Sequence, residues 1–103
     1  MIELITQKRE EVAGHCRRLN VRRLDVFGSA ARGNDFNEAK SDIDFLVEFV
    51  DHNTPGISKR YFDLERSLEA LFGRKVDLVV ARHFENPYFR MSVEESKEPV
   101  YAS

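Results

Sequence analysis

The chain has 103 residues, of which 42% are hydrophobic, and its formal net charge is −2. This length supplies one modest hydrophobic core, so we expect a single domain over residues 1–103 without a separate substrate-binding domain. A slightly acidic chain has no basic surface for non-specific nucleic-acid binding, and we find neither a membrane-spanning apolar run nor a signal-peptide pattern. Nucleic acid is therefore disfavoured as a direct substrate, and we expect a cytoplasmic protein. The single cysteine, Cys16, has no partner for an internal disulfide, which agrees with a reducing compartment.

The first predicted element is one helix that ends near Asn20. Its apolar residues recur at near-helical spacing: Ile5, Val12, Cys16 and Leu19. His15 lies among basic residues, namely Arg17, Arg18, Arg22 and Arg23. These residues could contact a phosphate or a partner, but we prefer a solvated basic helix end, which suits the helix dipole.

A strand over residues 24–27 then runs into a tight turn with the sequence GSAARG. Gly28 has no side chain and Ser29 only a small one, so the backbone can approach a ligand closely. Amides after Gly28, at a short helical start, could point at an anion, with the Ser29 hydroxyl and the Arg32 guanidinium adding contacts. The turn therefore suits phosphate.

Two polar connections follow in the chain. Residues 34–40 have no periodicity, and their Asp35 and Glu38 could be extra metal ligands. We prefer solvated loop carboxylates, because no strand orients them. The second connection, residues 51–56, is rich in turn formers. Its His52 is interpreted as an ordinary loop histidine, because no cysteine or second histidine lies at metal-binding spacing.

Between these connections, the stretch SDIDFLVEF predicts a strand in which Asp42 and Asp44 share one face. The opposite face carries the expected core residues Ile43, Phe45, Val47 and Phe49. A slip by one residue would bury the carboxylates, so this pattern determines the register. Two neighbouring anions repel each other unless a cation joins them. Carboxylate oxygens and open coordination positions favour magnesium, which also binds water and substrate phosphate.

The stretch ISKRYFDLERSLEALFG predicts the clearest helix, which ends at Gly73. Its apolar stripe contains Ile57, Tyr61, Leu64, Leu68 and Leu71, and we expect Phe62 and Phe72 to widen it. We expect this helix to cover the core face of the sheet.

The following stretch, KVDLVVA, predicts a strand with Asp77 on the face opposite its core residues Val76, Leu78 and Val80. An aspartate in an apolar strand is costly unless it is paired. If this strand lies beside the strand of Asp42 and Asp44, three carboxylates converge. The alternative is an ion pair at the sheet edge with Arg74, Lys75 or Arg22.

The last segment begins a short helix at Asn86 and Pro87 and becomes extended around residues 99–101. Its helix carries Tyr88, Phe89 and Met91. These side chains could form a partner surface or cap the open side of a small core, and the pattern favours neither.

The succession of GSAARG, SDIDFLVEF and the later Asp77 resembles the signature of the nucleotidyltransferase superfamily that includes DNA polymerase beta and kanamycin nucleotidyltransferase. The short chain is most similar to minimal nucleotidyltransferases, the MNT antitoxins that are commonly paired with HEPN-domain ribonuclease toxins. The resemblance covers nearly the whole chain. It implies an α/β (α+β) fold, with a small mixed sheet, helices mainly on one face and the carboxylates on the exposed side.

The resemblance also implies roles for the site residues. Asp42 and Asp44 match the carboxylates that bind two magnesium ions. Asp77 matches the third carboxylate, which binds the metal at the attacking hydroxyl and takes the proton of that hydroxyl. Two metal ions stabilise both the attacking and the leaving oxygens during in-line attack on the α-phosphate.

By the same resemblance, Gly28 and Ser29 hold the β- and γ-phosphates of ATP, and Arg32 helps to neutralise them. The expected acceptor is a tyrosine near the ribonuclease site of a HEPN toxin. A bulky anion added there would block RNA entry by charge and volume.

Two other functions compete with this prediction. The chain could be a binding module that neutralises a toxin by contact alone, but a retired site would have no reason to keep three unpaired strand carboxylates. It could also modify a small aminoglycoside-type antibiotic. That reaction needs a substrate pocket, which a chain of this length scarcely provides unless a dimer supplies it.

Overall fold

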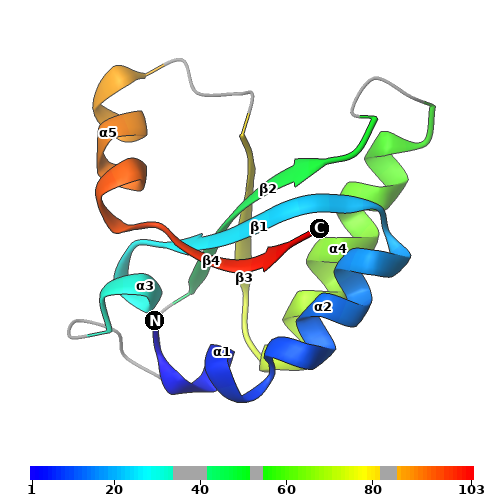
Figure 1. Cartoon of the computed structure of the whole chain (residues 1–103), viewed down its shortest axis with the longest axis horizontal. Coiled ribbons are helices and arrows are strands. Elements are labelled where there is room, and N and C mark those ends of the chain that lie inside the picture. The colour runs from blue at the N-terminus through cyan, green and yellow to red at the C-terminus, as the bar shows by residue number, and fades with distance from the viewer. Residues whose placement is uncertain (34–41, 52–54, 82–85) are drawn as a thin grey trace.

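A computed structural model describes residues 1–33, 42–51, 55–81 and 86–103. Within these residues, four strands form one mixed sheet in the order β3-β2-β1-β4 (Figure 1). The strands are β1 (Val21–Phe27), β2 (Ile43–Phe49), β3 (Val76–Val80) and β4 (Glu98–Ala102). Strand β1 is antiparallel to both β2 and β4, whereas β2 and β3 are parallel. The predicted mixed α/β fold is confirmed.

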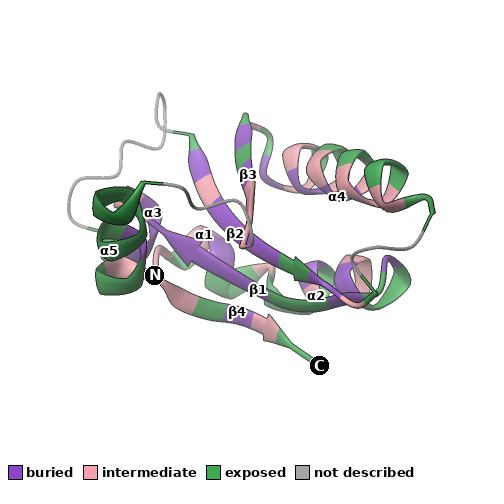
Figure 2. Cartoon of the chain, turned by 90° about the horizontal axis from the view of Figure 1, so that it is seen from above, coloured by how far each residue is buried: buried purple, intermediate pink, exposed green. Residues whose placement is uncertain are grey.

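The described helices are α1 (Glu3–Gln7), α2 (Arg9–Arg18), α3 (Ser29–Arg32), α4 (Ile57–Phe72) and α5 (Pro87–Ser96). Side chains of α1, α2 and α4 pack with the strands in the main core. Figures 1 and 2 place α5 at the opposite end of the sheet from α2 and α4. There α5 forms a separate apolar cluster, in which Val93 packs with Phe27 and Leu46.

Strand β2 shows the predicted alternation. Ile43, Phe45 and Val47 are fully buried in the main core, while the half-buried Asp44 lies on the other face. The pleat alone explains this alternation, because successive side chains of a strand point to opposite faces. The register predicted from the hydrophobic pattern is therefore confirmed.

The N-terminal segment differs from its prediction, because it forms two helices separated at Lys8 instead of one. The predicted core positions of this segment are nevertheless buried: Ile5, Val12, Cys16 and Leu19. Contacts of the chain terminus explain the break. The Met1 amino group donates to the Ala31 carbonyl at 2.7 Å and pairs with Glu98 at 2.9 Å. These long-range contacts hold the start of the chain against α3 and β4, and helical periodicity does not predict them.

Helix α4 has the predicted bounds, and Gly73 ends it in the left-handed conformation with φ 66°. Phe72 is buried as expected, but Phe62 is 50% exposed, so the prediction that Phe62 widens the buried stripe is wrong. The Phe62 ring instead meets the ring of Tyr61 edge-on, with centroids 5.3 Å apart. The core face of α4 is filled by Leu64 and Leu68, which leaves Phe62 on the solvent side.

The predicted start of α5 is confirmed, because the Asn86 side chain accepts hydrogen bonds from the first amides of the helix and Pro87 occupies its first turn. On the aromatic-rich side of α5, Phe89 meets the ring of the buried Phe27, but Tyr88 and Met91 do not cap the core. Tyr88 is 81% exposed and Met91 is 59% exposed, whereas Val93 is buried against the sheet. A partner surface on α5 remains a prediction. None of the helices in the described ranges is long and apolar enough to cross a membrane.

Candidate active site

Strands β2 and β3 bring the predicted carboxylates together at one edge of the sheet. In the parallel register, Asp44 lies opposite Asp77, and each is the second residue of its strand. Asp42 directly precedes β2 and is exposed. On the other side, Asp44 lies opposite Phe27, the last residue of β1. The strand of Asp77 therefore lies beside the strand of Asp44, which is the condition for their carboxylates to converge.

The carboxylates influence one another electrostatically. The pKa of Asp44 is raised from 3.8 to about 6, first by burial and then by the negative charges of Asp77 and Asp42. The positive charge of Arg32 acts in the opposite direction on this pKa. A cation between the carboxylates would remove the repulsion that raises the pKa of Asp44. The donor set consists of hard oxygen ligands and fits magnesium.

The metal-binding roles of the aspartates remain predictions. Among the residues described, no three His, Cys, Asp or Glu side chains are arranged so that they could hold a metal ion. The loop residues Asp35 and Glu38, and also His52, lie outside the described residues. The alternative ion pair between Asp77 and Arg22 is not formed, because Arg22 pairs with Glu48 at 3.9 Å.

Gly28 places the predicted phosphate turn directly against Asp44. Its backbone has φ 69° and ψ −148°, a conformation that is essentially restricted to glycine. A Cβ atom on Gly28 would lie 2.7 Å from Oδ2 of Asp44, so that a side chain at position 28 would force the Asp44 carboxylate or the turn to shift. Position 28 therefore requires glycine for both its backbone conformation and its space. The carboxylate row and the turn form one site.

Helix α3 follows this turn, and Gly33 ends it in the left-handed conformation with φ 84°. The amides of Ala31 and Arg32 donate to the Gly28 carbonyl, each at 3.1 Å. The two amides before them, at Ser29 and Ala30, precede the helical ladder and face the end where an anion can bind. The predicted helical start after Gly28 is confirmed, whereas the phosphate contacts of Ser29 and Arg32 remain predictions.

Helix α5 contacts the turn through Ser96, which sequence reasoning missed. The Gly28 amide donates to the Ser96 hydroxyl at 3.1 Å, and this hydroxyl donates to the Ser92 carbonyl at 3.1 Å. The Phe89 ring also meets the ring of Phe27 edge-on, with centroids 6.0 Å apart. No local pattern marks Ser96, because the contact joins residues that are 68 positions apart.

We expect Ser96→Ala to weaken Mg·ATP binding about fivefold, the effect of losing one hydrogen bond that positions the turn. Calorimetry measures this affinity. Ser96→Thr keeps the hydroxyl and should bind ATP as the wild type does. Ser92→Ala is the matched control on the same helix, because only the Ser92 carbonyl takes part in the contact. Unchanged affinity in Ser96→Ala would show that the bond does not position the turn.

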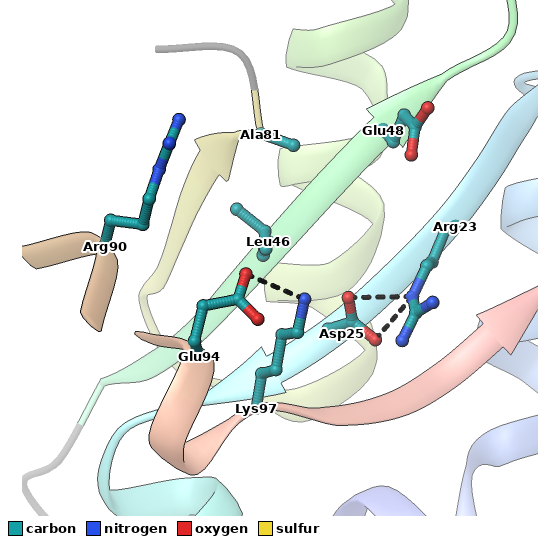
Figure 3. A pocket seen from close by; sticks show the side chains of 8 residues that line it. All are labelled: Arg23, Asp25, Leu46, Glu48, Ala81, Arg90, Glu94 and Lys97. Carbon is teal, nitrogen blue, oxygen red and sulfur yellow. Dashed lines mark hydrogen bonds and ion pairs between the residues drawn. The ribbon is translucent and has the colours of Figure 1, made fainter. Parts of the chain in front are cut away.

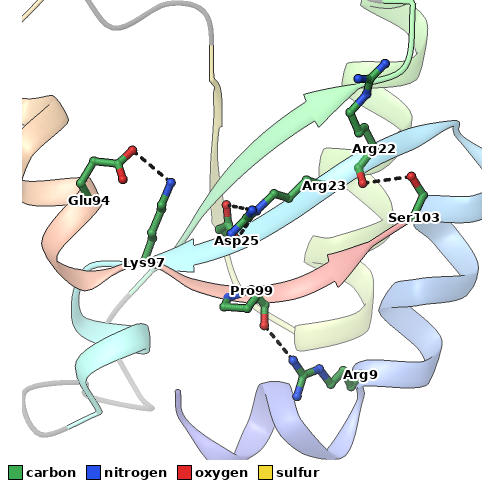
Figure 4. A network of polar contacts seen from close by, with 8 residues as sticks. All are labelled: Arg9, Arg22, Arg23, Asp25, Glu94, Lys97, Pro99 and Ser103. Atoms are coloured by element: carbon green, nitrogen blue, oxygen red, sulfur yellow. Dashed lines mark hydrogen bonds and ion pairs between the residues drawn. The ribbon is translucent and has the colours of Figure 1, made fainter.

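A second missed residue is Asp25, which is only 2% exposed on the same face of the sheet. Both of its carboxylate oxygens accept from Nε of Arg23 at 3.0 Å (Figures 3 and 4). The signal was present, because Asp25 is a carboxylate in an apolar strand, the pattern that identified Asp77. His15 lies elsewhere, on α2, where burial and then the charge of Arg18 lower its pKa.

A mixed sheet with a glycine turn against paired strand carboxylates is the arrangement expected of a nucleotidyltransferase. Residues 9–100 match the family model of the nucleotidyltransferase domain, and the chain belongs to this family. It is 48% identical over 65 residues to the protein adenylyltransferase MntA of Thermococcus cleftensis. The aligned residues cover 61% of this chain and 59% of MntA. It is 44% identical over 75 residues to a predicted protein adenylyltransferase of Methanocaldococcus jannaschii, MJ1379, covering 73% of this chain and 72% of that protein.

Solved structures share the fold. A predicted minimal nucleotidyltransferase matches with a TM-score of 0.74 and 35% identity over 94% of this chain and 93% of its own. The complex of a tri-AMPylated HEPN toxin with an MNT antitoxin from Shewanella oneidensis matches with a TM-score of 0.65. That match has 17% identity and covers 96% of this chain and 73% of the other, so it bears on the fold alone.

Proposed function

We propose that this protein is a magnesium-dependent adenylyltransferase that transfers AMP from ATP to a tyrosine of a HEPN ribonuclease toxin and so acts as its antitoxin. The observation that carries the proposal is the position of Gly28 against Asp44, which itself lies opposite Asp77. This arrangement places the turn that we propose to bind phosphate next to the carboxylates that we propose to bind metal ions. The relatives named adenylyltransferases support the choice of reaction. The choice of a HEPN toxin as partner follows from the resemblance of the sequence motifs to those of MNT antitoxins.

Three residues act on the metal ions and the acceptor. Asp42 and Asp44 would hold two magnesium ions, with Asp77 as a further ligand. When bound, these ions stabilise negative charge on the attacking and leaving oxygens. The tyrosine oxygen forms a bond to the α-phosphorus, and the bond from that phosphorus to the bridging oxygen of pyrophosphate breaks. Asp77, which is exposed at the edge strand, accepts the tyrosine proton.

The turn binds the leaving group. The amides of Ser29 and Ala30 donate to the β- and γ-phosphates, and Gly28 allows these phosphates to approach the backbone closely. Arg32 neutralises part of their charge, in agreement with its electrostatic effect on Asp44. Cytoplasmic location and a single domain over residues 1–103 remain predictions that accompany this proposal.

Two alternative functions, a contact-only antitoxin and an antibiotic-modifying enzyme, can be distinguished from the proposed adenylyltransferase. The contact-only antitoxin would need no carboxylate row, yet Asp44 and Asp77 lie side by side at an energetic cost that a bound cation would offset. For the antibiotic-modifying alternative, the expectation that the chain scarcely has a pocket for the acceptor remains a prediction. A cavity of about 360 Å³ lies on the same face of the sheet.

The test is co-expression with a candidate HEPN toxin from the same organism, followed by mass spectrometry of that partner. We expect adenylyl additions on a tyrosine with the wild type and none with Asp42→Ala/Asp44→Ala. Glu10→Ala/Glu11→Ala removes two exposed carboxylates from α2 and should leave the additions unchanged. If the aspartate double variant still silences the toxin, and the wild type leaves its partner unmodified, neutralisation occurs by contact.

A further inference from the structure

The cavity of about 360 Å³ opens between α5 and the face of the sheet that carries the carboxylates (Figure 3). Leu46 of β2 and Ala81 after β3 form its apolar part. Asp25 of β1 lies at its base, and Arg90 and Lys97 approach from α5 and its end. The volume falls in the range of roughly 300–1,000 Å³ that is typical of small-ligand pockets.

Strand register places this cavity directly beside the candidate active site. Asp77, Asp44 and Phe27 form one row across the sheet, and Val79, Leu46 and Asp25 are paired in the next row. Residues two apart on a strand are separated by roughly 6.5–7 Å. A ligand with its reacting phosphate at Asp44 therefore reaches the cavity by extending one row along the strands.

The geometry of the proposed transfer indicates which part of the substrate extends that way. The attacking hydroxyl and the leaving pyrophosphate lie on opposite sides of the phosphorus in an in-line displacement. In the proposed transfer, the pyrophosphate would lie at Gly28, on the β1 side of Asp44, and the hydroxyl would lie at Asp77, on the β3 side. The ester oxygen that carries the ribose is a further substituent of the same phosphorus and lies on neither the pyrophosphate side nor the hydroxyl side. Along the strands, the next row at Leu46 offers this part of the substrate the space of the cavity.

The lining also suits a nucleoside better than a phosphate chain. The side chains of Leu46 and Ala81 offer apolar surface to a ring, and Asp25 is a buried carboxylate with two acceptor oxygens. Each oxygen accepts from Nε of Arg23 and retains capacity for donors such as ribose hydroxyls or an amino group of a base. Glu48 and Glu94 add negative charge to the lining, which disfavours phosphate there.

Arg90 differs from the other two cations of the lining. Arg23 pairs with Asp25 at 3.0 Å, and Lys97 pairs with Glu94 at 3.0 Å. Arg90 makes no ion pair with another residue of the described ranges, and it is exposed on α5. A planar guanidinium in this position can stack on the ring of a base.

We infer that this cavity binds the nucleoside part of the nucleotide substrate, with Asp25 accepting hydrogen bonds from it and Arg90 stacking on the base. The inference rests on the proposed nucleotidyl transfer and adds a specificity site that the carboxylates and the turn do not provide. Asp25 and Arg90 contact neither the phosphates nor the acceptor in this arrangement.

The test compares the affinities of Mg·ATP and of magnesium tripolyphosphate, which has no nucleoside, by calorimetry. Arg90→Ala should weaken ATP binding about fivefold through the loss of stacking. Ala81→Leu places a larger side chain in the cavity and should weaken ATP binding roughly tenfold. Both variants should bind tripolyphosphate as the wild type does. Arg17→Ala removes the same charge from an exposed position on α2 and should change neither affinity.

Other outcomes overturn the inference in distinguishable ways. Equal weakening of both ligands would show that the variants act on the phosphate turn. Unchanged ATP affinity with slower AMP transfer to the partner would assign the cavity to the acceptor. If the wild type binds neither ligand in the presence of magnesium, the proposed function itself fails, and the inference fails with it.

Discussion

Asp77→Asn should lower AMP transfer about 100-fold or more while Mg·ATP affinity changes little, because a proton acceptor acts mainly in the transition state. Asn has nearly the same shape as Asp, and position 77 is exposed on the edge strand, so the fold should persist. Single-turnover transfer to the partner and calorimetry with Mg·ATP measure the two effects separately.

Asp63→Asn is the matched control for Asp77→Asn. It removes a carboxylate from α4 that pairs with Lys59 at 3.2 Å, and it should leave both transfer and ATP affinity unchanged. If Asp77→Asn transferred AMP as fast as the wild type, Asp77 would have a structural role at the sheet edge and no role in catalysis. A parallel loss of ATP affinity and of transfer would instead make Asp77 chiefly a ligand of the bound nucleotide and its metal.

Gly28→Ala has the second large expected effect, because the added Cβ would lie 2.7 Å from Oδ2 of Asp44. The turn and the carboxylate must then move apart. A displacement of roughly 1 Å in an active site can lower the rate about 100-fold. The backbone conformation of Gly28 adds strain of about 1–3 kcal/mol, which lowers the free energy of unfolding. Urea unfolding and the transfer assay measure these two quantities.

Two other glycines separate the causes of this effect. Gly33 also has positive φ, but nothing lies within 4 Å of its Cβ position, so Gly33→Ala should cost about 1–2 kcal/mol of stability and spare the site. Gly14 is inside α2 with open space around it, and Gly14→Ala should stabilise the helix by about 0.5–1 kcal/mol. If Gly28→Ala transfers AMP as fast as Gly33→Ala does, the close contact with Asp44 is unimportant for catalysis.

Local chemistry accounts for the parts of the fold and site that could be predicted. The two-residue alternation of side chains along a strand predicted that Asp44 and Phe45 lie on opposite faces of the sheet. In the structure Phe45 is buried in the core and Asp44 is on the other face. The stripe of α4 ending at Gly73, and the cap formed by Asn86, were also predicted correctly. Each of these features depends on residues within a few positions of one another, where helix and strand geometry leave few choices.

The sequence by itself therefore determined the family signature and the strands and turn that carry it, whereas the shared face of Asp42 and Asp44 remains a prediction because β2 begins at Ile43. Tertiary structure alone decided that β3 pairs with β2, so that Asp77 lies opposite Asp44, and that the N-terminal segment breaks at Lys8. It also decided that the Gly28 amide meets Ser96. The physical reason is distance along the chain. These contacts join residues that are far apart in the sequence, and the residues next to each partner give no local pattern that predicts the contact. Packing of the whole sheet determines which of these residues meet.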